Sequence, residues 1–247
     1  MRLGIEFIEK TEYETIHISR SYLKGIHENV PNIIDTTFKL AYFTGDLGNV
    51  ETPEGTFLSI CKITYMQAPY TFWALYNLYE KGYYLEAINL YRHLIEAFIQ
   101  LRYFYKYPSK LEEHIKQTKR INFSAMFNEF SAGYYKRYYS NQLSEAAHGF
   151  IFKHMHRVDL DPSGKRRTVM GSQFDVDRAT YVINNTIPLL FGFINWFPKF
   201  FNNNNLDDET KCRITESISW LEIAMASHKR ANTGSMKWYE HMDKFIQ

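Results

Sequence analysis

The pattern of apolar and polar side chains predicts a long helix over residues 82–107, around which the rest of the chain is organised. Apolar residues recur at helical spacing on two adjoining faces of this segment. They are Tyr84, Ile88, Tyr91, Ile95 and Phe98 on one face, and Tyr83, Ala87, Leu90, Leu94, Leu101 and Phe104 on the next. A helix that is apolar on more than one face is surrounded by other elements. We therefore expect this helix at the centre of the fold.

The same periodicity predicts further helices on both sides of the central one. They cover residues 6–29, 32–43, 57–80, 111–120, 123–130, 134–148, 177–200 and 206–229. Pro31 should end the first of them, because a proline has no N–H and its ring clashes with the preceding turn. Thr56 is expected to cap the helix that begins at residue 57, and Pro69 to kink it. The short Lys81–Gly82 turn should then place that helix antiparallel to the central one.

Residues 154–171 lack a helical period and contain Pro162, Gly164 and Gly171, which predicts a long loop or a small hairpin. No segment alternates long enough to predict a strand of ordinary length. The chain is therefore predicted to be all-α, a helical bundle forming a single domain over residues 1–247, with a long loop near 152–174. Its core is expected over about 57–229, with the helix of residues 6–29 packed on it and a tail over 230–247.

Composition adds to this picture. Aromatic residues make up 17% of the sequence, which predicts a tightly packed aromatic interior. The net charge of +2 is too small to indicate nucleic-acid binding by itself, so that function would have to rest on a local basic patch. The two cysteines, Cys61 and Cys212, have no CxxC spacing and no histidine pairing, which fits a reducing compartment and argues against a thiolate zinc site.

The apolar runs of the chain are too short for export or for a membrane span. Glu6 and Glu9 interrupt the N-terminal stretch in which a signal peptide needs an apolar run. The cleanest apolar run, residues 187–194, is too short to cross a bilayer. We therefore expect a cytoplasmic protein that makes no membrane contact.

Arg92 and Glu96 stand four residues apart between the apolar faces of the central helix. In this order such a pair adds little to an isolated helix, and a buried ion pair costs desolvation, so its role should be tertiary. Two interpretations stay open. The pair ties helices together, or Arg92 clamps an anion, Glu96 holds Arg92, and His148 acts as general acid or base. A structural role is also open to His148, because it precedes Gly149 at a predicted helix end, where the helix dipole favours a histidine.

Two E-x-x-H motifs, Glu14–His17 and Glu145–His148, raise the alternative of a bundle that binds two metal ions. Glu96 and Glu222 are further carboxylates available to such a site. Two matches to so loose a pattern are close to chance in a chain of this composition, and their order differs from the ferritin-like pattern. We therefore predict no metal and no cofactor. The chain also lacks the phosphate-binding and nucleophile motifs of the common enzyme classes.

A cluster of basic residues lies in the predicted loop. Its members are Lys153, His154, His156, Arg157, Lys165, Arg166 and Arg167, and they are opposed by Asp159 and Asp161. Clustered cations beside a flexible glycine can contact phosphates, and neighbouring aromatic rings can stack on bases. The alternative is an ordinary solvated loop. The residues predicted to bind nucleic acid are Lys153, Arg157, Lys165, Arg166 and Arg167.

Gly82, the segment Tyr91–Ala97, Pro108 and the segment Ser144–Gly149 resemble the signature of a widespread, uncharacterised bacterial family of helical proteins. In that family an Arg-x-x-x-Glu helix is followed by a Ser-x-x-x-His-Gly helix end, and the resemblance covers residues 57–152. The family is similar in layout to HEPN domains, helical bundles that often act as ribonucleases or RNA-binding partners in toxin–antitoxin and phage-defence systems.

This resemblance implies an intracellular helical protein that acts on or binds RNA. It places a metal-independent ribonuclease site at Arg92, Glu96 and His148, and its implied partners are RNA, a second copy of the chain or an antitoxin-like protein. Catalytic HEPN proteins usually carry an Arg, four to six residues and then a His on one helix near the C-terminal side of the bundle. Here only Arg20 and His27 have such a spacing, and they lie in the first predicted helix. The alternative is a non-catalytic interaction or scaffold module.

Overall fold

The protein is an all-α helical bundle, which confirms the predicted fold class. The computed structural model describes residues 4–46, 51–116, 122–134, 158–160, 163, 166–168, 172–201 and 206–231. Eight helices and two very short strands lie within these ranges. The helices are α1 (Ile5–Tyr22), α2 (Lys24–Tyr42), α3 (Pro53–Glu80), α4 (Tyr84–Lys106), α5 (Pro108–Ile115), α6 (Phe123–Tyr134), α8 (Val176–Phe200) and α9 (Asp208–Ala231), and the strands are β1 (Val158–Leu160) and β2 (Arg166–Thr168).

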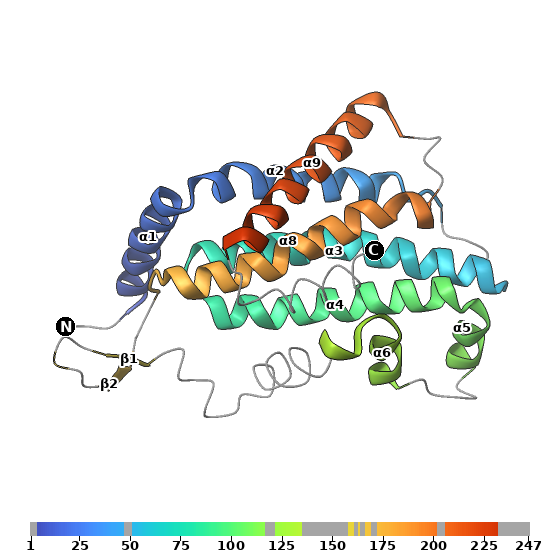
Figure 1. The fold of residues 1–247 in the computed structure, drawn as a ribbon, viewed down its shortest axis with the longest axis horizontal. Helices are drawn as coiled ribbons and strands as arrows, with labels where there is room; N and C mark the ends of the chain where they lie inside the picture. The colour runs from blue at the N-terminus through green and yellow to red at the C-terminus, as the bar shows by residue number, and fades with distance from the viewer. Residues whose placement is uncertain are drawn as a thin grey trace.

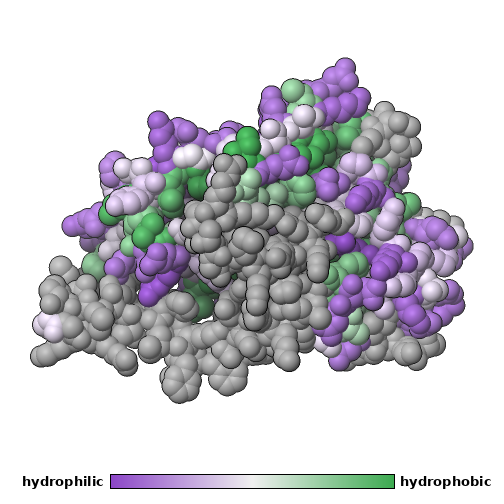
Figure 2. All heavy atoms as spheres, viewed as in Figure 1, coloured by the Kyte–Doolittle hydropathy of each residue, from purple (hydrophilic) through white to green (hydrophobic). Residues whose placement is uncertain are grey.

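Helix α4 packs against α3 and α8, while α2 and α9 cover the other side of those two helices (Figure 1). Neighbouring helices therefore cover the apolar faces of α4, as predicted, but α3 and α8 form the middle layer of the bundle. Helix α1 stands at one end of the bundle and α5 at the other. On α4, Tyr91, Ile95 and Phe98 are almost fully buried. Among the coloured residues on the face seen in Figure 2, hydrophilic ones predominate, and smaller groups of hydrophobic ones are exposed between them.

The predicted turn at Lys81–Gly82 joins α3 to α4 and sets the two helices antiparallel (Figure 1). Gly82 has a φ of 78°, a conformation that costs glycine little and other residues much. A Cβ at this position would lie 2.5 Å from the carbonyl oxygen of Gln173. The turn therefore needs glycine for both its backbone conformation and its close packing.

The prediction that Pro31 ends the first helix is wrong. Pro31 lies inside α2, and the chain leaves helical geometry earlier, at Leu23, where φ is −117° and ψ is 38°. Proline raises the cost of a helix without forbidding it when packing holds the helix in place. Val30, Ile33 and Ile34, the neighbours of Pro31, are buried in the core and supply that packing.

The predicted cap at Thr56 is also wrong, because α3 begins earlier, at Pro53. The hydroxyl of Thr52 accepts a hydrogen bond from the N–H of Gly55 at 3.0 Å, which makes Thr52 the cap. Pro53 suits the first helical position because no N–H is needed there. Thr56 instead donates its hydroxyl to the carbonyl oxygen of Thr52 at 2.9 Å. Helix α3 continues through Pro69, and the kink at that residue stays a prediction.

The interior is aromatic, as the composition predicts. Tyr65 is buried and donates its hydroxyl to the carbonyl oxygen of Phe193 in α8 at 2.8 Å. Its ring makes edge contacts with Phe193, Phe197, Phe200 and Phe201. The same apolar cluster includes residues of α2, among them Val30 and Leu40.

Strands β1 and β2 form an antiparallel pair in which Val158 lies opposite Thr168. This confirms a small hairpin within residues 154–171. The helix predicted over residues 134–148 lies outside the described residues beyond Tyr134. Within the described ranges, no helix combines the length and apolar character needed to cross a membrane.

Candidate functional site

The predicted pair of Arg92 and Glu96 forms on α4. The Nε atom of Arg92 lies 2.8 Å from Oε1 of Glu96, and the two side chains are 21% and 28% exposed. The pair is therefore half-buried and lies along one helix. His148, its predicted catalytic partner, lies outside the described residues, so the meeting of these three side chains stays a prediction.

The basic loop cluster is described only in part. Lys153, Arg157 and Lys165 lie outside the described residues. Arg166 and Arg167 form two of the three residues of β2, where they lie opposite Leu160 and Asp159. The nucleic-acid-binding role of this cluster stays a prediction.

The residues weighed for a two-metal site do not come together where the structure describes them. Glu14 and His17 are exposed on α1, while Glu96 lies on α4 and Glu222 is exposed on α9. The described residues contain no group of three or more His, Cys, Asp or Glu side chains that can hold a metal ion. Glu145 and His148 lie outside the described ranges.

A different group of polar side chains meets where α1, α2 and α3 converge. Ser19 and Arg20 lie in the last turn of α1, and His27 lies in the first turn of α2, across the break at Leu23. Tyr76 and Glu80 stand four residues apart at the end of α3, so they share one helical face. We call these five residues the Glu80 cluster.

The carboxylate of Glu80 joins Arg20 to His27. Its Oε1 atom lies 2.5 Å from Nε of Arg20 and 3.8 Å from Nδ1 of His27. The side chains of Glu80 and His27 are only 9% and 6% exposed, whereas that of Arg20 is 62% exposed. A buried carboxylate thus fixes a guanidinium at the surface and lies close to an imidazole.

Both ring nitrogens of His27 have hydroxyl partners. Nδ1 lies 2.7 Å from the hydroxyl of Tyr76, and Nε2 lies 2.9 Å from the hydroxyl of Ser19. A neutral imidazole donates from one nitrogen and accepts at the other, and a hydroxyl can take either role, so both bonds are satisfied in either tautomer. The side chain of Ser19 is fully buried, so in this conformation it does not serve as a nucleophile toward a bound substrate.

The protonation states in the cluster follow from burial and from Glu80. Burial lowers the pKa of His27, and the negative charge of Glu80 offsets only part of this effect, so the ring is neutral near pH 7. The hydrogen bond and the charge of Glu80 raise the pKa of Arg20. Burial raises the pKa of Tyr76, which keeps its hydroxyl protonated. The cluster therefore combines a fixed positive charge with a neutral base.

The sequence contains only part of the signal for this cluster. Arg20 and His27 have the spacing discussed above, but the helix expected over residues 6–29 would have placed them on one continuous element. In the structure the break at Leu23 separates them. Glu80, which joins them, lies 53 residues beyond His27, and no spacing rule connects positions that far apart.

Comparisons of the chain with family models, with curated proteins and with solved structures found no match. The likeness to HEPN-type bundles therefore rests on the motifs quoted for it, and a function has to be argued from the side chains that the structure brings together.

Proposed function

We propose that the protein binds RNA and cleaves it without a metal ion, with Arg20 holding a phosphate and His27 transferring the proton. The observation that carries this proposal is the position of the Glu80 carboxylate between the exposed guanidinium of Arg20 and the neutral ring of His27. Arginine suits phosphate because its planar fork donates several hydrogen bonds to it. Histidine suits proton transfer because it titrates near neutrality.

The chemistry of such a site uses the 2′-hydroxyl of RNA. His27 removes the proton of that hydroxyl, and its oxygen attacks the adjacent phosphorus while the bond to the 5′-oxygen of the next nucleotide breaks. The leaving 5′-oxygen takes up a proton from the protonated His27 ring or from water, so the products are a 2′,3′-cyclic phosphate and a 5′-hydroxyl. Arg20 offsets the negative charge that develops on the phosphate, and Glu80 stabilises the protonated ring. DNA lacks the 2′-hydroxyl, so it should not be cleaved.

The structure also imposes a condition on this reaction. The ring of His27 is nearly buried and both of its nitrogens are hydrogen-bonded to hydroxyls of the protein. A substrate hydroxyl has to replace Ser19 or Tyr76 at one of these nitrogens. A movement of the end of α1 would withdraw the Ser19 hydroxyl from the His27 ring, because Ser19 belongs to the last turn of α1. Arg20 belongs to the same turn.

The test is cleavage of total RNA and of tRNA by the purified protein, with and without a chelator. We expect wild-type cleavage in both conditions, no cleavage of DNA of the same sequence, and a loss of about 100-fold or more in His27→Gln and Arg20→Ala. Cleavage at the wild-type rate by these two variants, with circular dichroism showing the native fold, would remove the Glu80 cluster from the mechanism.

A matched pair of variants separates this site from the one predicted at Arg92, Glu96 and His148. If Arg92→Ala and His148→Ala lose cleavage while His27→Gln retains it, the reaction occurs at the second site and our assignment to the Glu80 cluster is wrong. If His27→Gln alone loses it, the Glu80 cluster carries the chemistry. A role in a toxin or phage-defence system is a proposal that follows only from observed cleavage.

One observation favours the non-catalytic alternative, an interaction or scaffold module. Every polar atom of the His27 ring already has a partner, so the Glu80 cluster is also well suited to tying three helices together. This alternative predicts that the wild-type protein cleaves no RNA. Cleavage by wild type that is lost in His27→Gln, while circular dichroism shows that this variant keeps the native fold, would contradict it.

A further inference from the structure

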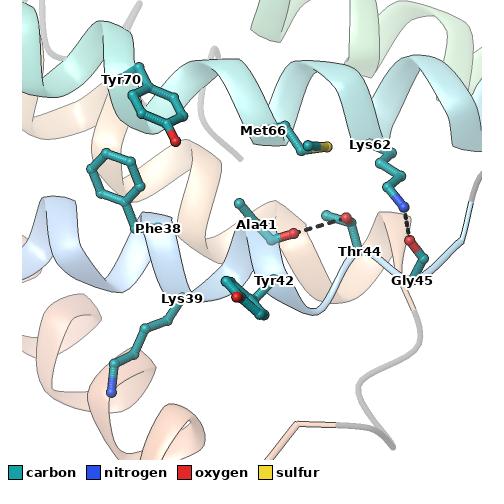
Figure 3. A pocket seen from close by; sticks show the side chains of 9 residues that line it. All are labelled: Phe38, Lys39, Ala41, Tyr42, Thr44, Gly45, Lys62, Met66 and Tyr70. Carbon is teal, nitrogen blue, oxygen red and sulfur yellow. Dashed lines mark hydrogen bonds between the residues drawn. The ribbon is translucent and has the colours of Figure 1, made fainter.

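A groove of about 460 Å³ lies between the C-terminal end of α2 and the middle of α3 (Figure 3), and none of its lining residues belongs to the Glu80 cluster. Three aromatic rings and the side chain of Met66 contribute to its lining, together with two lysines and small residues. Phe38 and Tyr70 lie at one end, Tyr42 lies across the middle, and Lys62 lies at the other end. Its volume falls within the range of about 300–1,000 Å³ that is usual for sites that bind small ligands.

The rings of this groove are unusually accessible. Tyr42 is 93% exposed and Tyr70 is 68% exposed. Phe38 packs edge-on against Tyr70, with ring centroids 5.0 Å apart and planes at 88°, which holds the Tyr70 ring in a defined orientation. Exposed aromatic rings gathered in one concave site offer flat faces on which another aromatic ring can stack.

The ammonium group of Lys62 lies at one end of the groove. Lys62 donates from its ammonium group to the carbonyl oxygen of Gly45, a neutral acceptor. An ammonium has three donors, so this bond uses one of them. Among the described residues, no carboxylate is bonded to Lys62, whereas the nearby Lys39 lies 2.5 Å from Oε1 of Glu209. Within the described ranges, the groove thus presents the cation of Lys62 without a salt bridge beside its aromatic rings.

We propose that this groove binds a nucleotide, with the base stacked on Tyr42 and Tyr70 and the phosphate at Lys62. A base and its phosphate combine the flat ring and the negative charge that the two ends of the groove accept. The nucleotide has two sources, a residue of single-stranded RNA or a free mononucleotide. The RNA source rests on the proposed function, while the base and phosphate chemistry does not.

Helix α3 connects the groove with the Glu80 cluster. Lys62 and Glu80 are 18 residues apart on this helix, which corresponds to about 27 Å. Trp73, which is 45% exposed, lies between them and stacks on Tyr76 with ring centroids 5.8 Å apart. A single strand bound in the groove can therefore follow exposed aromatic residues of α3 toward Arg20, and it needs about four or more nucleotides to do so.

The test measures binding by fluorescence anisotropy with a labelled six-nucleotide RNA, and by competition with adenosine monophosphate and uridine monophosphate. Tyr42→Ala should weaken binding about tenfold or more, as the loss of a stacking platform does. Lys62→Gln should weaken it and reduce the slope of log affinity against log salt by about one. The matched controls are Tyr13→Ala, a 74% exposed tyrosine on α1, and Lys116→Gln at the end of α5, which should bind like wild type.

The competition distinguishes the two sources. If a mononucleotide displaces the labelled RNA at the same concentration as an unlabelled six-nucleotide strand does, the ligand is a free nucleotide. A much stronger effect of the longer strand identifies single-stranded RNA. Both results support the proposal when Tyr42→Ala weakens binding. Unchanged binding in Tyr42→Ala and Lys62→Gln, or no binding by wild type, overturns it.

Two further measurements complete the design. One result would separate the two proposals. If wild type cleaves no RNA but both wild type and His27→Gln bind nucleotide, the proposed cleavage is wrong and nucleotide binding in the groove is supported. Light scattering tests whether a second copy of the chain occupies the groove. If wild type is a dimer that binds no nucleotide, and Tyr42→Ala is a monomer, a second copy occupies the groove and the proposal is wrong.

Discussion

At the scale of the residue, the burial of His27 makes the stability of the protein depend on pH. Burial lowers its pKa below the ordinary value of 6.5, so the folded protein resists the protonation that the unfolded chain accepts. The contribution of His27 to the free energy of unfolding is therefore fully present above pH 6.5 and is lost as the pH falls below that value. We predict that the free energy of unfolding declines between about pH 7 and about pH 5.5.

The check is urea unfolding followed by circular dichroism at these two values of pH. His27→Gln should lower stability at neutral pH, because the amide does not reproduce both hydrogen bonds of the ring, and should flatten the decline. His93→Gln serves as the control, because His93 is exposed on α4. The same decline in wild type and in His27→Gln would show that other groups cause it.

Residues that act through distant partners mark the limit of prediction from the sequence. The pair of Arg92 and Glu96 was predictable because both residues lie on one helix and four residues form about one turn. The spacing of Arg20 and His27 was visible in the sequence, but the cluster that they form was not. Glu80, which joins them, comes from another helix that lies beside them in the fold. Local periodicity contains no information about which distant carboxylate completes a cluster.

At the scale of the element, the existence of helices was more predictable than their ends. Apolar periodicity predicts which segments are helical, and α3, α4, α8 and α9 lie where it predicted helices. Gly25, two residues beyond Leu23, is the only glycine or proline close to the end of α1, and Leu23 itself packs against the core. Tertiary contacts therefore decide this break, and Pro31 is accommodated within α2 for the same reason.

The packing of α4 on α8 depends on a small residue. A Cβ added to Gly192 would lie 2.8 Å from Cζ of Phe98, closer than real contacts allow. Alanine normally improves a helix interior by about 1 kcal/mol relative to glycine. Here we predict that Gly192→Ala instead destabilises the protein by about 1–3 kcal/mol, because the buried ring of Phe98 or one of the two helices has to shift.

Thermal unfolding measures this effect, with Gly25→Ala in α2 as the control. A Cβ at Gly25 would meet nothing within 4 Å, so this change should leave stability equal or slightly higher. Adding Phe98→Leu to Gly192→Ala should restore part of the loss, since the smaller side chain gives room. A Gly192→Ala variant as stable as wild type would mean that Phe98 rearranges without cost.

At the scale of the whole molecule, α1 differs from the other long helices in how it is held. Its buried residues are Thr15 and Ser19, whereas α4 and α8 bury mainly large apolar side chains. Polar contacts connect α1 with the rest of the bundle. Lys81 lies 2.9 Å from Glu12, the hydroxyl of Ser172 donates to the carbonyl oxygen of Thr11 at 3.1 Å, and Arg20 pairs with Glu80.

Such contacts stabilise a helix less than apolar burial does, so α1 should open before the core unfolds. We predict that amide hydrogens of α1 exchange with solvent faster than those of α4 and α8, as mass spectrometry can measure. Glu12→Gln and Arg20→Ala should speed exchange in α1 further, while α4 stays unchanged. Lys10→Gln is the control, because the pair of Lys10 with Glu14 lies within α1 and does not cross to another helix.

This opening is also the movement that the proposed reaction requires, because the end of α1 holds Ser19 against the ring of His27. A variant that opens α1 more often should therefore expose His27 more often. Glu12→Gln changes none of the five residues of the Glu80 cluster and should raise both the exchange rate of α1 and the rate of RNA cleavage. Faster exchange with unchanged cleavage would show that the movement of α1 does not limit the reaction.

The exchange measurement also tests how α1 is held. If the amide hydrogens of α1 are as well protected as those of α4, the polar contacts of α1 hold it as firmly as apolar packing holds α4.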